Sequence, residues 1–443
     1  MKKYETYFDT NNWALALPKH WQEVKVKFIA KVETGSTPSK NDYSNYDNGE
    51  RLFVKPDDLN EFEQITESNE KVTEKAFSES RIIKKGSLLA CAIGSIGKFG
   101  IAGCDLITNQ QINSLTFIKK KYNEKYGVYA FIASIDEHWK NSTLNVVSIL
   151  NKTSQSNIKF PLPPLPEQRQ IAAYLDYKTN QIDCFIANRK KQIELLEEQK
   201  EAIINKAVTK GIDPKVKLKP SGVNWIGDIP EHWEVWKVSR LFRTIGSGTT
   251  PKAGLPKYYE DGTINWINTG DLNDGILNNC SNKITQLAIA EHSTLKIYPV
   301  GSLIIAMYGA TIGKLAITNI EACTNQACCV LNKSKKISIE FAFYWLKSSK
   351  KDIINMSYGG GQPNISQDIV KSLKIPIPPK MDEQNDIINF IKNELSERNE
   401  LISKYQKQID LMQEYKTSLI SKAVTGKIDV REWQPKQTIK ETV

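Results

Sequence analysis

Two copies of one sequence pattern fill nearly all of this 443-residue chain. The first copy opens with Leu17-Pro18-Lys19-His20-Trp21 and the second with Ile229-Pro230-Glu231-His232-Trp233. The later matches, in order, are Gly35-Ser36-Thr37-Pro38 with Gly248-Thr249-Thr250-Pro251, Asp58-Leu59 with Asp271-Leu272, Gly86-Ser87-Leu88 with Gly301-Ser302-Leu303, Gly94 to Lys98 with Gly309 to Lys314, and Thr108-Asn109-Gln110 with Thr324-Asn325-Gln326. The offset drifts only from 212 residues (Trp21 to Trp233) to 216 (Thr108 to Thr324). Such a repeat predicts two similarly folded domains, and the chain is too long for a single core.

Each copy ends in a long helical segment with an apolar seam. The seam of the first copy is Ile171, Leu175, Ile182, Ile186, Ile193, Leu196, Ile203 and Ala207. A shift of 216 gives Ile387, Ile391, Arg398, Ile402, Ile409, Met412, Leu419 and Ala423. Spacings of three, four and seven keep one stripe of a helix facing a partner helix. Because Lys178, Arg189 and Lys200 interrupt the first stripe, we expect the two helices to pair with each other as an antiparallel coiled coil.

Before each helix, the sequence predicts a strand-rich body of about 150 residues. Apolar runs such as Ser87 to Ile93 and Ser302 to Met307 are bounded by glycine turns, as buried strands usually are. Proline-rich segments follow, Phe160 to Pro166 and Ile375 to Pro379. We expect them to be stiff connectors, because proline fixes φ and is poorly tolerated inside helices.

The limits of both helices follow from their end residues. Glu167-Gln168 and Glu383-Gln384 open them, with the acidic side chain in the first turn, where the helix dipole favours it. The first helix is expected from Glu167 to about Val208, roughly 60 Å at 1.5 Å per residue. Gly211 and Gly426 are the predicted stops.

The predicted fold class is therefore α+β, with two tandem strand-rich α/β domains separated by long paired helices in a pseudo-two-fold repeat. We expect the first domain at 1–160 and the first helical region at 161–212. The second domain should cover 213–375, the second helical region 376–430, and a polar, loosely ordered tail 431–443.

Bulk composition excludes some classes of protein. No apolar run approaches the ~20 residues of a membrane span, and the N-terminus leads directly into polar residues, unlike a signal peptide. Seven cysteines without C-x-x-C spacing, and only four histidines, argue against a zinc site and favour reduced thiols in the cytoplasm. A net charge of +10 is compatible with a polyanionic partner but does not demonstrate one.

A search for catalytic motifs predicts no catalytic residues, metal ligands or cofactor site in this chain. The turn Gly309 to Lys314 is one residue short of a phosphate-binding loop, and Leu315 stands where Ser or Thr is needed. The sequence lacks the Asn-Pro-Pro-aromatic or Asp-Pro-Pro-aromatic segment of amino-methyltransferases. Pro56-Asp57 has no acidic-x-Lys partner of a nuclease within the next thirty residues, and Gly246-Ser247-Gly248 is interpreted as a turn. His20 and His232 are expected to have packing or capping roles.

Duplication suits a ligand with two similar segments, such as duplex DNA held at two places. Lys98 and Lys314 end matching glycine turns, where an ammonium group and backbone N–H groups can meet a phosphate, although a solvated hairpin lysine is an equal alternative. The amides of Asn109-Gln110-Gln111 and Asn325-Gln326 have the chemistry to pair with adenine. Residues identical in both copies cannot explain how two domains distinguish different bases, so a structural role is favoured for Asn109 and Asn325.

Sequence discrimination is instead expected in loops where the copies diverge. Neutral drift of surface loops is the alternative for each of these positions. The candidate DNA-binding residues are Lys40, Tyr43, Lys55, Lys98 and Gln111 in the first copy, and Lys252, Asn268, Thr269, Tyr308, Lys314 and Gln362 in the second.

The sequence resembles the specificity subunit of type I restriction-modification systems. The P-x-H-W openings, the P-x-P-P segments, the Glu-Gln helix starts and the Lys-Ala-Val-Thr helix ends (Lys206 to Thr209 and Lys422 to Thr425) carry the resemblance over essentially the whole chain. One departure is Ser148-Ile149-Leu150-Asn151 in the first copy, where the second has Pro363-Asn364-Ile365-Ser366.

The resemblance implies a non-catalytic subunit whose two domains each bind one half of a split, asymmetric sequence in double-stranded DNA. It implies paired helices that set the gap between the half-sites, and docking to two methyltransferase subunits and to restriction/translocase subunits. S-adenosylmethionine, ATP and magnesium are then expected in those partners. Domains entering the major groove on one face of B-DNA would lie about one turn, ~34–36 Å, apart.

Three other functions remain open from the residues alone. The chain could be a stand-alone duplicated DNA-binding regulator, a methyltransferase with an unrecognised cofactor site, or a structural coiled-coil adaptor. The first differs from a specificity subunit in binding its DNA tightly without partners.

Overall fold

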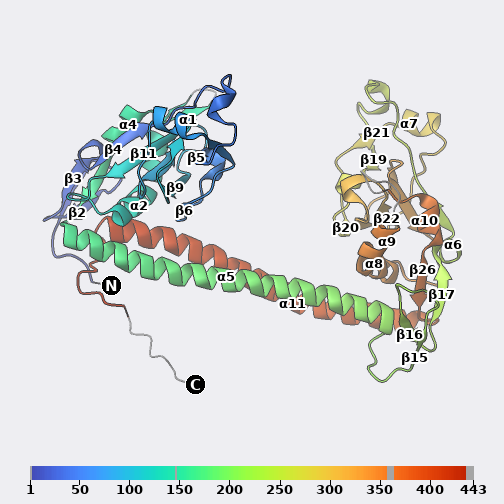
Figure 1. The fold of residues 1–443 in the computed structure, drawn as a ribbon. Coiled ribbons are helices and arrows are strands. Elements are labelled where there is room, and N and C mark those ends of the chain that lie inside the picture. The colour runs from blue at the N-terminus through green and yellow to red at the C-terminus, as the bar shows by residue number, and fades with distance from the viewer. Residues whose placement is uncertain (1, 145–146, 357–363, 436–443) are drawn as a thin grey trace. The chain divides into compact units, whose positions relative to one another are not determined.

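The computed structural model of the chain describes residues 2–144, 147–356 and 364–435. They fall into two compact units, one combining Met1–Arg189 with Lys407–Val443 and the other consisting of Lys190–Gln406. Each unit holds one strand-rich domain and part of each of two long helices, α5 (Leu165–Lys210) and α11 (Met381–Val424) (Figure 1).

The first domain is built on a five-stranded sheet in the order β4-β11-β8-β9-β6 and a three-stranded sheet in the order β10-β5-β7. Their strands are β4 (Ala30–Thr34), β5 (Arg51–Val54), β6 (Gln64–Ile65), β7 (Glu70–Val72), β8 (Leu88–Cys91), β9 (Phe99–Ala102), β10 (Ile107–Thr108) and β11 (Ile112–Phe117). Strands that pair in twos are β1 (Tyr7–Asp9) with β2 (Ala16–Pro18), β3 (Gln22–Lys25) with β14 (Lys159–Leu162), and β12 (Thr143–Leu144) with β13 (Ser148–Ile149). The β6–β9 and β5–β10 pairs are parallel and the others antiparallel.

The second domain repeats the two larger sheets strand for strand, and its pairs β15–β16 and β17–β26 match β1–β2 and β3–β14. Its five-stranded sheet has the order β18-β25-β22-β23-β20 and its three-stranded sheet the order β21-β19-β24, with β20–β23 and β19–β24 as the parallel pairs. The strands are β15 (Leu218–Pro220), β16 (Asp228–Pro230), β17 (Glu234–Lys237), β18 (Thr244–Gly246), β19 (Ile264–Ile267), β20 (Gly275–Leu277), β21 (Lys283–Ile284), β22 (Leu303–Ala306), β23 (Leu315–Thr318), β24 (Ala322–Thr324), β25 (Cys328–Asn332) and β26 (Lys374–Ile377). The predicted fold class is confirmed.

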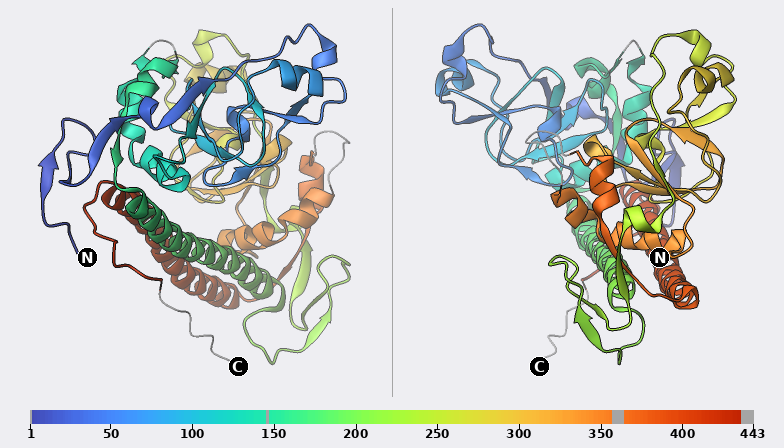
Figure 2. Two further views of the ribbon diagram at one scale, coloured as in Figure 1. Left: turned by 60° about the vertical axis from the view of Figure 1, so that its left-hand side comes forward. Right: turned by 90° about the vertical axis from the view of Figure 1, so that its right-hand side faces the viewer.

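Short helices cover the sheets in both domains (Figures 1 and 2). In the first domain they are α1 (Glu74–Glu79), α2 (Glu124–Ala133), α3 (Ile135–Lys140) and α4 (Lys152–Asn157), with 3-10 turns η1 (Val26–Phe28), η2 (Tyr43–Asn45) and η3 (Pro56–Asp58). In the second they are α6 (Val238–Leu241), α7 (Gln286–Glu291), α8 (Ile339–Ser348), α9 (Lys350–Asn355) and α10 (Gln367–Ser372), with η4 (Pro256–Tyr258), η5 (Thr269–Asp271) and η6 (Gly309–Thr311). All four residues of β8 and of β22 are buried, as their continuous apolar runs predict.

The long helices pair within each unit (Figure 1). In the first unit the beginning of α5 lies beside the end of α11, where Lys416 Nζ contacts Asp183 Oδ1 at 2.8 Å. In the second unit the end of α5 and the beginning of α11 share one apolar cluster that includes Ile204 and Ile387. The helices therefore run in opposite directions in each unit.

The predicted seam is the inward stripe of both helices. Seam residues that are buried are Ile171, Leu175, Ile182, Ile186, Ile387, Ile391, Ile409 and Leu419. Those that are half-buried are Ile193, Leu196, Ile203, Ile402 and Met412. Arg398, which interrupts the seam, is half-buried and contacts Glu394 of its own helix at 2.8 Å.

The helix starts are bound to their domains through the predicted opening motifs. Glu167 Oε2 accepts a hydrogen bond from Trp21 Nε1 at 2.9 Å, and its Oε1 lies 2.7 Å from His20 Nε2. In the second domain the matching residues are Glu383, Trp233 and His232, at 2.9 and 3.0 Å. The two histidines, which were expected to have packing or capping roles, each contact the carboxylate in the first turn of their helix.

The glutamine after each glutamate also bonds to its domain. Gln168 is fully buried; its Oε1 accepts from Asn123 N at 2.7 Å, at the start of α2, and its Nε2 donates to Pro163 O at 2.8 Å. Gln384 makes the equivalent bonds in the second domain, at 2.8 and 3.0 Å. Each long helix therefore starts from a fixed position on its own domain.

The proline-rich segments are not merely connectors, and this prediction was wrong. Phe160 and Pro161 belong to β14, which pairs with β3, and Pro376 belongs to β26, which pairs with β17. Proline is tolerated in such two-stranded ladders because its missing N–H can face away from the partner strand. The expected boundaries at residues 160 and 375 fall inside these two strands.

The start of the expected polar tail also packs on the first unit. The Trp433 ring lies 5.2 Å from that of Tyr174 and 5.4 Å from that of Tyr177, centroid to centroid. Arg431 pairs with Asp429 at 2.7 Å. Residues 436–443 lie outside the described residues. Among the helices in the described ranges, none is long and apolar enough to cross a membrane.

Candidate nucleic-acid interface

Four segments of each domain meet at the end of the buried strand β8 or β22, and we call each group the loop edge. In the first domain it consists of residues 34–37, 92–98, 108–111 and 148–151, and in the second of residues 247–250, 307–314, 324–327 and 364–366. Ala92 N donates to Gln111 O at 2.7 Å, and Leu150 N to Ala92 O at 2.8 Å. The same two contacts recur at the residue after β22, at 2.8 and 2.9 Å. The loop edge is thus one backbone frame built twice.

The repeated glycine of the G-x-T-P motif is required where two segments cross. A Cβ on Gly248 would lie 1.7 Å from Thr324 O, and one on Gly35 would lie 2.3 Å from Thr108 O. After the crossing, Thr37 Oγ1 donates to Gln110 Oε1 at 2.6 Å. Thr250 and Gln326 form the same bond at 2.7 Å. The two repeated motifs are therefore two halves of one structural joint.

Asn109 and Asn325 have the predicted structural role. Asn109 is buried, and its Oδ1 accepts from Gln111 N at 3.1 Å. Asn325 Oδ1 accepts from Ala327 N at 3.0 Å. The candidate Gln111 is half-buried, with its Oε1 accepting from Asn109 Nδ2 at 2.8 Å.

The Asp-Leu motif builds a second repeated turn next to the loop edge. Asp58 Oδ2 accepts from Lys55 N at 2.8 Å, and Asp271 Oδ2 accepts from Asn268 N at the same distance. The turn is joined to the edge because Asn109 N donates to Val54 O at 3.2 Å. The side chains it presents differ between the domains, and the structure brings the candidates Lys55, Asn268 and Thr269 to this place.

The two candidate lysines of the glycine turns differ in their contacts. Lys98 Nζ donates to Pro56 O at 2.6 Å, which ties the glycine turn to the turn before it. Lys55, beside Pro56, forms an ion pair with Glu70. Lys314, half-buried at the position matching Lys98, has no side-chain hydrogen bond to any residue in the described ranges.

The remaining candidates lie on the surface. Lys40, Tyr43 and Lys252 are exposed, Tyr43 to 82%. They lie in two equivalent loops, residues 38–46 and 251–259. Each loop is closed by the same hydrogen bond, from Tyr46 OH to Pro38 O at 2.7 Å and from Tyr259 OH to Pro251 O at 2.6 Å. Tyr308 is 40% exposed on the loop edge. Gln362 lies outside the described residues.

Two β-bridges across the loop edge were missed by sequence reasoning. Ile93 bridges to Ile149 in the first domain, and Tyr308 bridges to Asn364 in the second. The signal was present in the departure between Ser148 to Asn151 and Pro363 to Ser366, since Asn151 and Ser366 are equivalent helix caps of α4 and α10. Within the described residues, 149–151 and 364–366 make the same backbone contacts and differ in their side chains.

Burial raises the pKa of the Cys328 and Cys329 thiols to about 12, so neither is a thiolate at neutral pH. Among the residues that the structure describes, no group of three or more His, Cys, Asp or Glu is placed to hold a metal ion.

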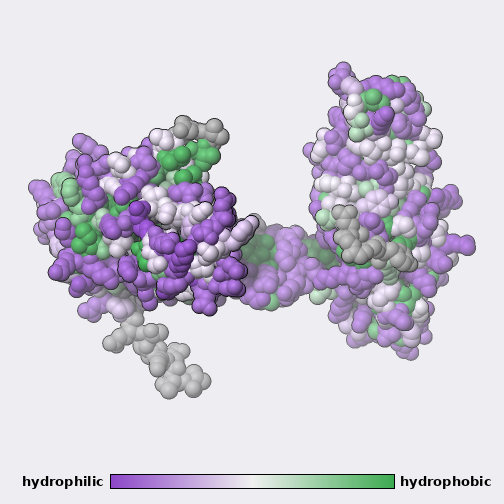
Figure 3. All heavy atoms as spheres, turned by 45° about the horizontal axis from the view of Figure 1, so that its top comes forward, coloured by the Kyte–Doolittle hydropathy of each residue, from purple (hydrophilic) through white to green (hydrophobic). Residues whose placement is uncertain are grey.

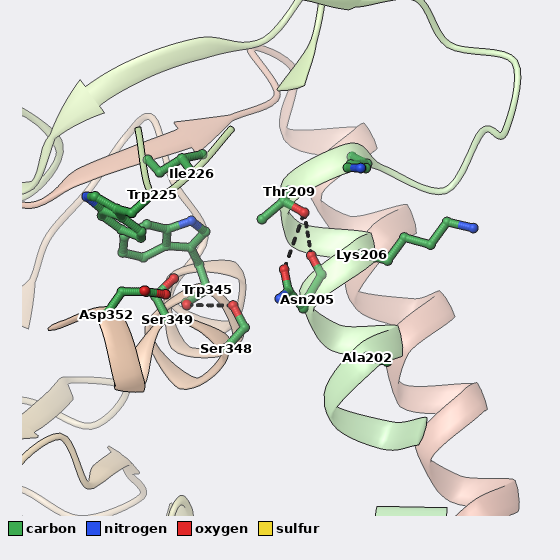
Figure 4. Close-up of a pocket in the computed structure, with 11 residues that line it drawn as sticks. Ala202, Asn205, Lys206, Thr209, Trp225, Ile226, Trp345, Ser348, Ser349 and Asp352 are labelled. Atoms are coloured by element: carbon green, nitrogen blue, oxygen red, sulfur yellow. Dashed lines mark hydrogen bonds between the residues drawn. The ribbon is translucent and has the colours of Figure 1, made fainter. Parts of the chain in front are cut away.

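Hollows lie on the loop edge and beside the long helices. One of about 560 Å³ in the first domain is lined by Thr34, Ile93, Gln110, Asn113 and Ile149 among others. Another, of about 460 Å³, lies in the second unit between the end of α5 and helices α8 and α9, and Trp225 and Trp345 face it (Figure 4). A third, of about 650 Å³ in the first unit, is lined by Tyr174, Tyr177, Tyr415 and Trp433.

The repeat coincides with a known protein family. The family model described as the type I restriction modification DNA specificity domain matches residues 18–195 and again 230–411. The chain belongs to this family. Both matches begin within a P-x-H-W motif, so the domains of this family correspond to the two copies seen in the sequence.

Two relatives span nearly the whole chain. The MjaIX specificity subunit of Methanocaldococcus jannaschii is 25% identical over 97% of this chain and 98% of its own length. The MjaVIII specificity subunit of the same organism is 26% identical over 94% and 95%. A chain from a structural study of assembly and conformational transition in the type I system has a TM-score of 0.73 over 93% of this chain and 99% of its own, at 16% identity. The HsdS subunit from Thermoanaerobacter tengcongensis has a TM-score of 0.54 over 93% and 98%, at 15% identity. These two structures share the fold.

Proposed function

We propose that this chain is the DNA-recognition subunit of a type I restriction-modification complex, with each domain binding one half of a split, asymmetric target. The observation that carries the proposal is the loop edge. The same hydrogen-bonded frame is built twice and presents different side chains in the two domains, as recognition of two different half-sites requires. Phosphate contacts position such a frame on DNA, and contacts to base edges give it specificity.

In this proposal the subunit itself is not catalytic. Its buried thiols have raised pKa values, and its histidines at the opening motifs are occupied with helix glutamates. Methyl transfer and DNA translocation then belong to partner subunits, which would hold S-adenosylmethionine, ATP and magnesium.

The helical regions are the proposed docking surfaces for two methyltransferase subunits. Large apolar side chains are exposed on them, including Leu411 (53%) and Tyr415 (43%) in the first unit and Leu195 (44%) in the second. Isolated apolar residues are common on surfaces, but Tyr415 lines the hollow of the first unit described above, and Leu195 lies one turn before the residues of α5 that line a hollow in the second unit. Restriction/translocase subunits would join the complex so formed.

The paired helices would set the gap between the two half-sites. Each helix starts from a fixed position on one domain, through the glutamate and glutamine contacts, and continues without interruption over 46 residues in α5 and 44 in α11. Two domains on one face of B-DNA would contact sites about one helical turn apart, with several uncontacted base pairs between them.

Methylome sequencing of a methylation-free host tests this function. The host expresses the chain with its methyltransferase partner, and the control omits the chain. We expect N6-methyladenine at one split motif, present only when the chain is expressed. A continuous motif, or none despite a soluble and active complex, would contradict the proposal. Tight and specific DNA binding by the isolated chain would instead favour the stand-alone regulator.

A further inference from the structure

The β-bridge at the loop edge presents a different pair of side chains in each domain. In the first domain the pair is Ile93 and Ile149, and in the second it is Tyr308 and Asn364. The first pair is apolar and the second carries a hydroxyl and an amide. The backbone that holds them is the same, so the difference lies in the chemistry of the side chains, which are half-buried at Ile93 and Ile149 and exposed at Tyr308 and Asn364.

Both pairs are held firmly by neighbouring buried residues. Leu150, next to Ile149, is 1% exposed and donates from its N to Ala92 O at 2.8 Å. Ile365, next to Asn364, is fully buried and donates from its N to Met307 O at 2.9 Å. Because the backbone is already fixed, contact with a ligand has to order only the side chains.

In the first domain the bridge belongs to a small antiparallel arrangement of strands. Gly94 N also donates to Ser148 O at 2.9 Å, so residues 92–94 and 148–150 form a short antiparallel ribbon, and β12 pairs with β13 (Ser148–Ile149) along the other side of that strand. The major groove of B-DNA admits a two-stranded ribbon. Val147, next to this ribbon, is 46% exposed, and hydrophobic side chains gather on part of the surface of the first domain (Figure 3).

We infer that these bridge pairs are specificity-determining residues, with Ile93 and Ile149 selecting a thymine methyl group in one half-site and Tyr308 and Asn364 selecting a hydrogen-bonding base edge, adenine foremost, in the other. Apolar side chains distinguish thymine through its methyl group, and the amide of asparagine matches N6 and N7 of adenine. The inference rests on the proposed function and assigns the discriminating residues within it.

Exchange of the pairs tests the inference in the assembled complex. The second-domain variant is Tyr308→Ile with Asn364→Ile, and the first-domain variant is Ile93→Tyr with Ile149→Asn. Methylome sequencing of each should show altered preference at one or two adjacent positions of a single half-site, with the other half and the gap unchanged. The two variants should affect opposite halves.

Milder variants guard against loss of folding. Tyr308→Phe removes only a hydroxyl group, and Asn364→Ala only an amide. On oligonucleotides substituted at one position, we expect either change to reduce discrimination in methylation rate on the order of tenfold. Leu287→Ala, at an exposed residue of α7 in the same domain, is the matched control and should change nothing.

The outcomes separate this inference from the proposed function. A split motif for the unmodified complex, kept unchanged in all four bridge variants, would overturn the inference and leave the function intact. The absence of any split motif for the unmodified complex would overturn the proposed function itself.

Discussion

Glu167 and Glu383 explain why two short motifs about 150 residues apart occur together in each copy. Each carboxylate lies in the first turn of a long helix and accepts the indole N–H of a buried tryptophan from the opening motif. Hydrogen bonds to charged groups are stronger than neutral ones, and a negative charge at this end of a helix is favourable. Each motif was visible in the sequence, but their contact was not, because it depends on how the domain folds back to the helix start.

Replacement of one of these glutamates should weaken the contact between that helix start and its own domain, and leave the contact in the other domain unchanged. Glu167→Ala leaves the Trp21 indole N–H buried without its acceptor, which we expect to cost about 1–3 kcal/mol. Hydrogen exchange should then accelerate in the first turns of α5 and in residues 16–25. Glu383→Ala is the matched variant and should act on α11 and residues 228–237 instead. Equal effects of either variant on both joints would contradict this assignment.

His138 is a buried titratable residue that the sequence did not single out. It lies in α3 against Phe131, ring centroids 4.6 Å apart, and its Nδ1 is 2.8 Å from Ser134 O. Complete burial lowers the pKa of this imidazole to about 4, opposed only in part by the bond to Ser134. The matching residue of the second domain is Ile353, since both follow a serine helix cap by four positions.

The first domain should therefore lose stability in mild acid. In the unfolded chain the imidazole of His138 takes up a proton near pH 6.5, and in the folded domain only near pH 4. The stability that the domain gains from the neutral imidazole is therefore complete above pH 6.5 and is lost as the pH falls from 6.5 towards 4. The loss should reach on the order of 2–3 kcal/mol. Hydrogen exchange of α2 and β14 between pH 7 and 5 measures it, with α8 and β26 of the second domain as the internal control. His138→Ile should remove the difference, and a variant with unchanged acid sensitivity would refute the explanation.

At the scale of single elements, the sequence predicted what depends on local pattern. Runs bounded by glycine turns became β8 and β22, and the first helix, expected from Glu167 to Val208, extends from Leu165 to Lys210. The proline-rich segments were misassigned because a proline in a two-stranded ladder looks locally like one in a connector. Whether such a segment forms a strand depends on its pairing with β3 or β17, which lie over a hundred residues away in the sequence.

The seam of the helix pair gives an element-scale prediction. Leu175 is fully buried, whereas Leu411 of α11, in the same unit, is 53% exposed. Leu175→Ala should destabilise the first unit by about 2–4 kcal/mol, because it leaves a cavity between packed elements. Leu411→Ala should cost less than about 1 kcal/mol. Urea unfolding followed by hydrogen exchange compares the two, and similar losses would show that Leu175 is not part of the packed seam.

At the scale of the whole molecule, segments from the beginning and the end of the sequence meet in the first unit at the place where the second unit has one continuous segment. In the second unit the chain continues from Gly211, which packs near Trp233, into the hairpin β15–β16. In the first unit Gly426 packs in the same way near Trp21, but here the neighbouring residues come from two separate segments, one near residue 2 and one near residue 429. Asp429 N donates to Lys2 O at 3.0 Å, and Tyr7 OH donates to Gly426 O at 2.9 Å. The repeat predicted from the sequence is thus closed by contacts that only the fold could reveal.

A circularly permuted chain should accordingly keep its structure. We would join the existing ends with a short Gly/Ser linker and open the chain between Pro214 and Lys215, which are exposed. Because the break lies in an exposed linker and the new connection joins segments already in contact, the free energy of unfolding should change by less than about 1 kcal/mol. Methylome sequencing with the methyltransferase partner should give the same motif as the natural order. Opening the chain between Ile304 and Ile305, inside the buried β22, is the control and should abolish folding. A permuted chain that is soluble but specifies a different motif would mean that the contacts between the termini determine the recognition itself and do not merely close the repeat.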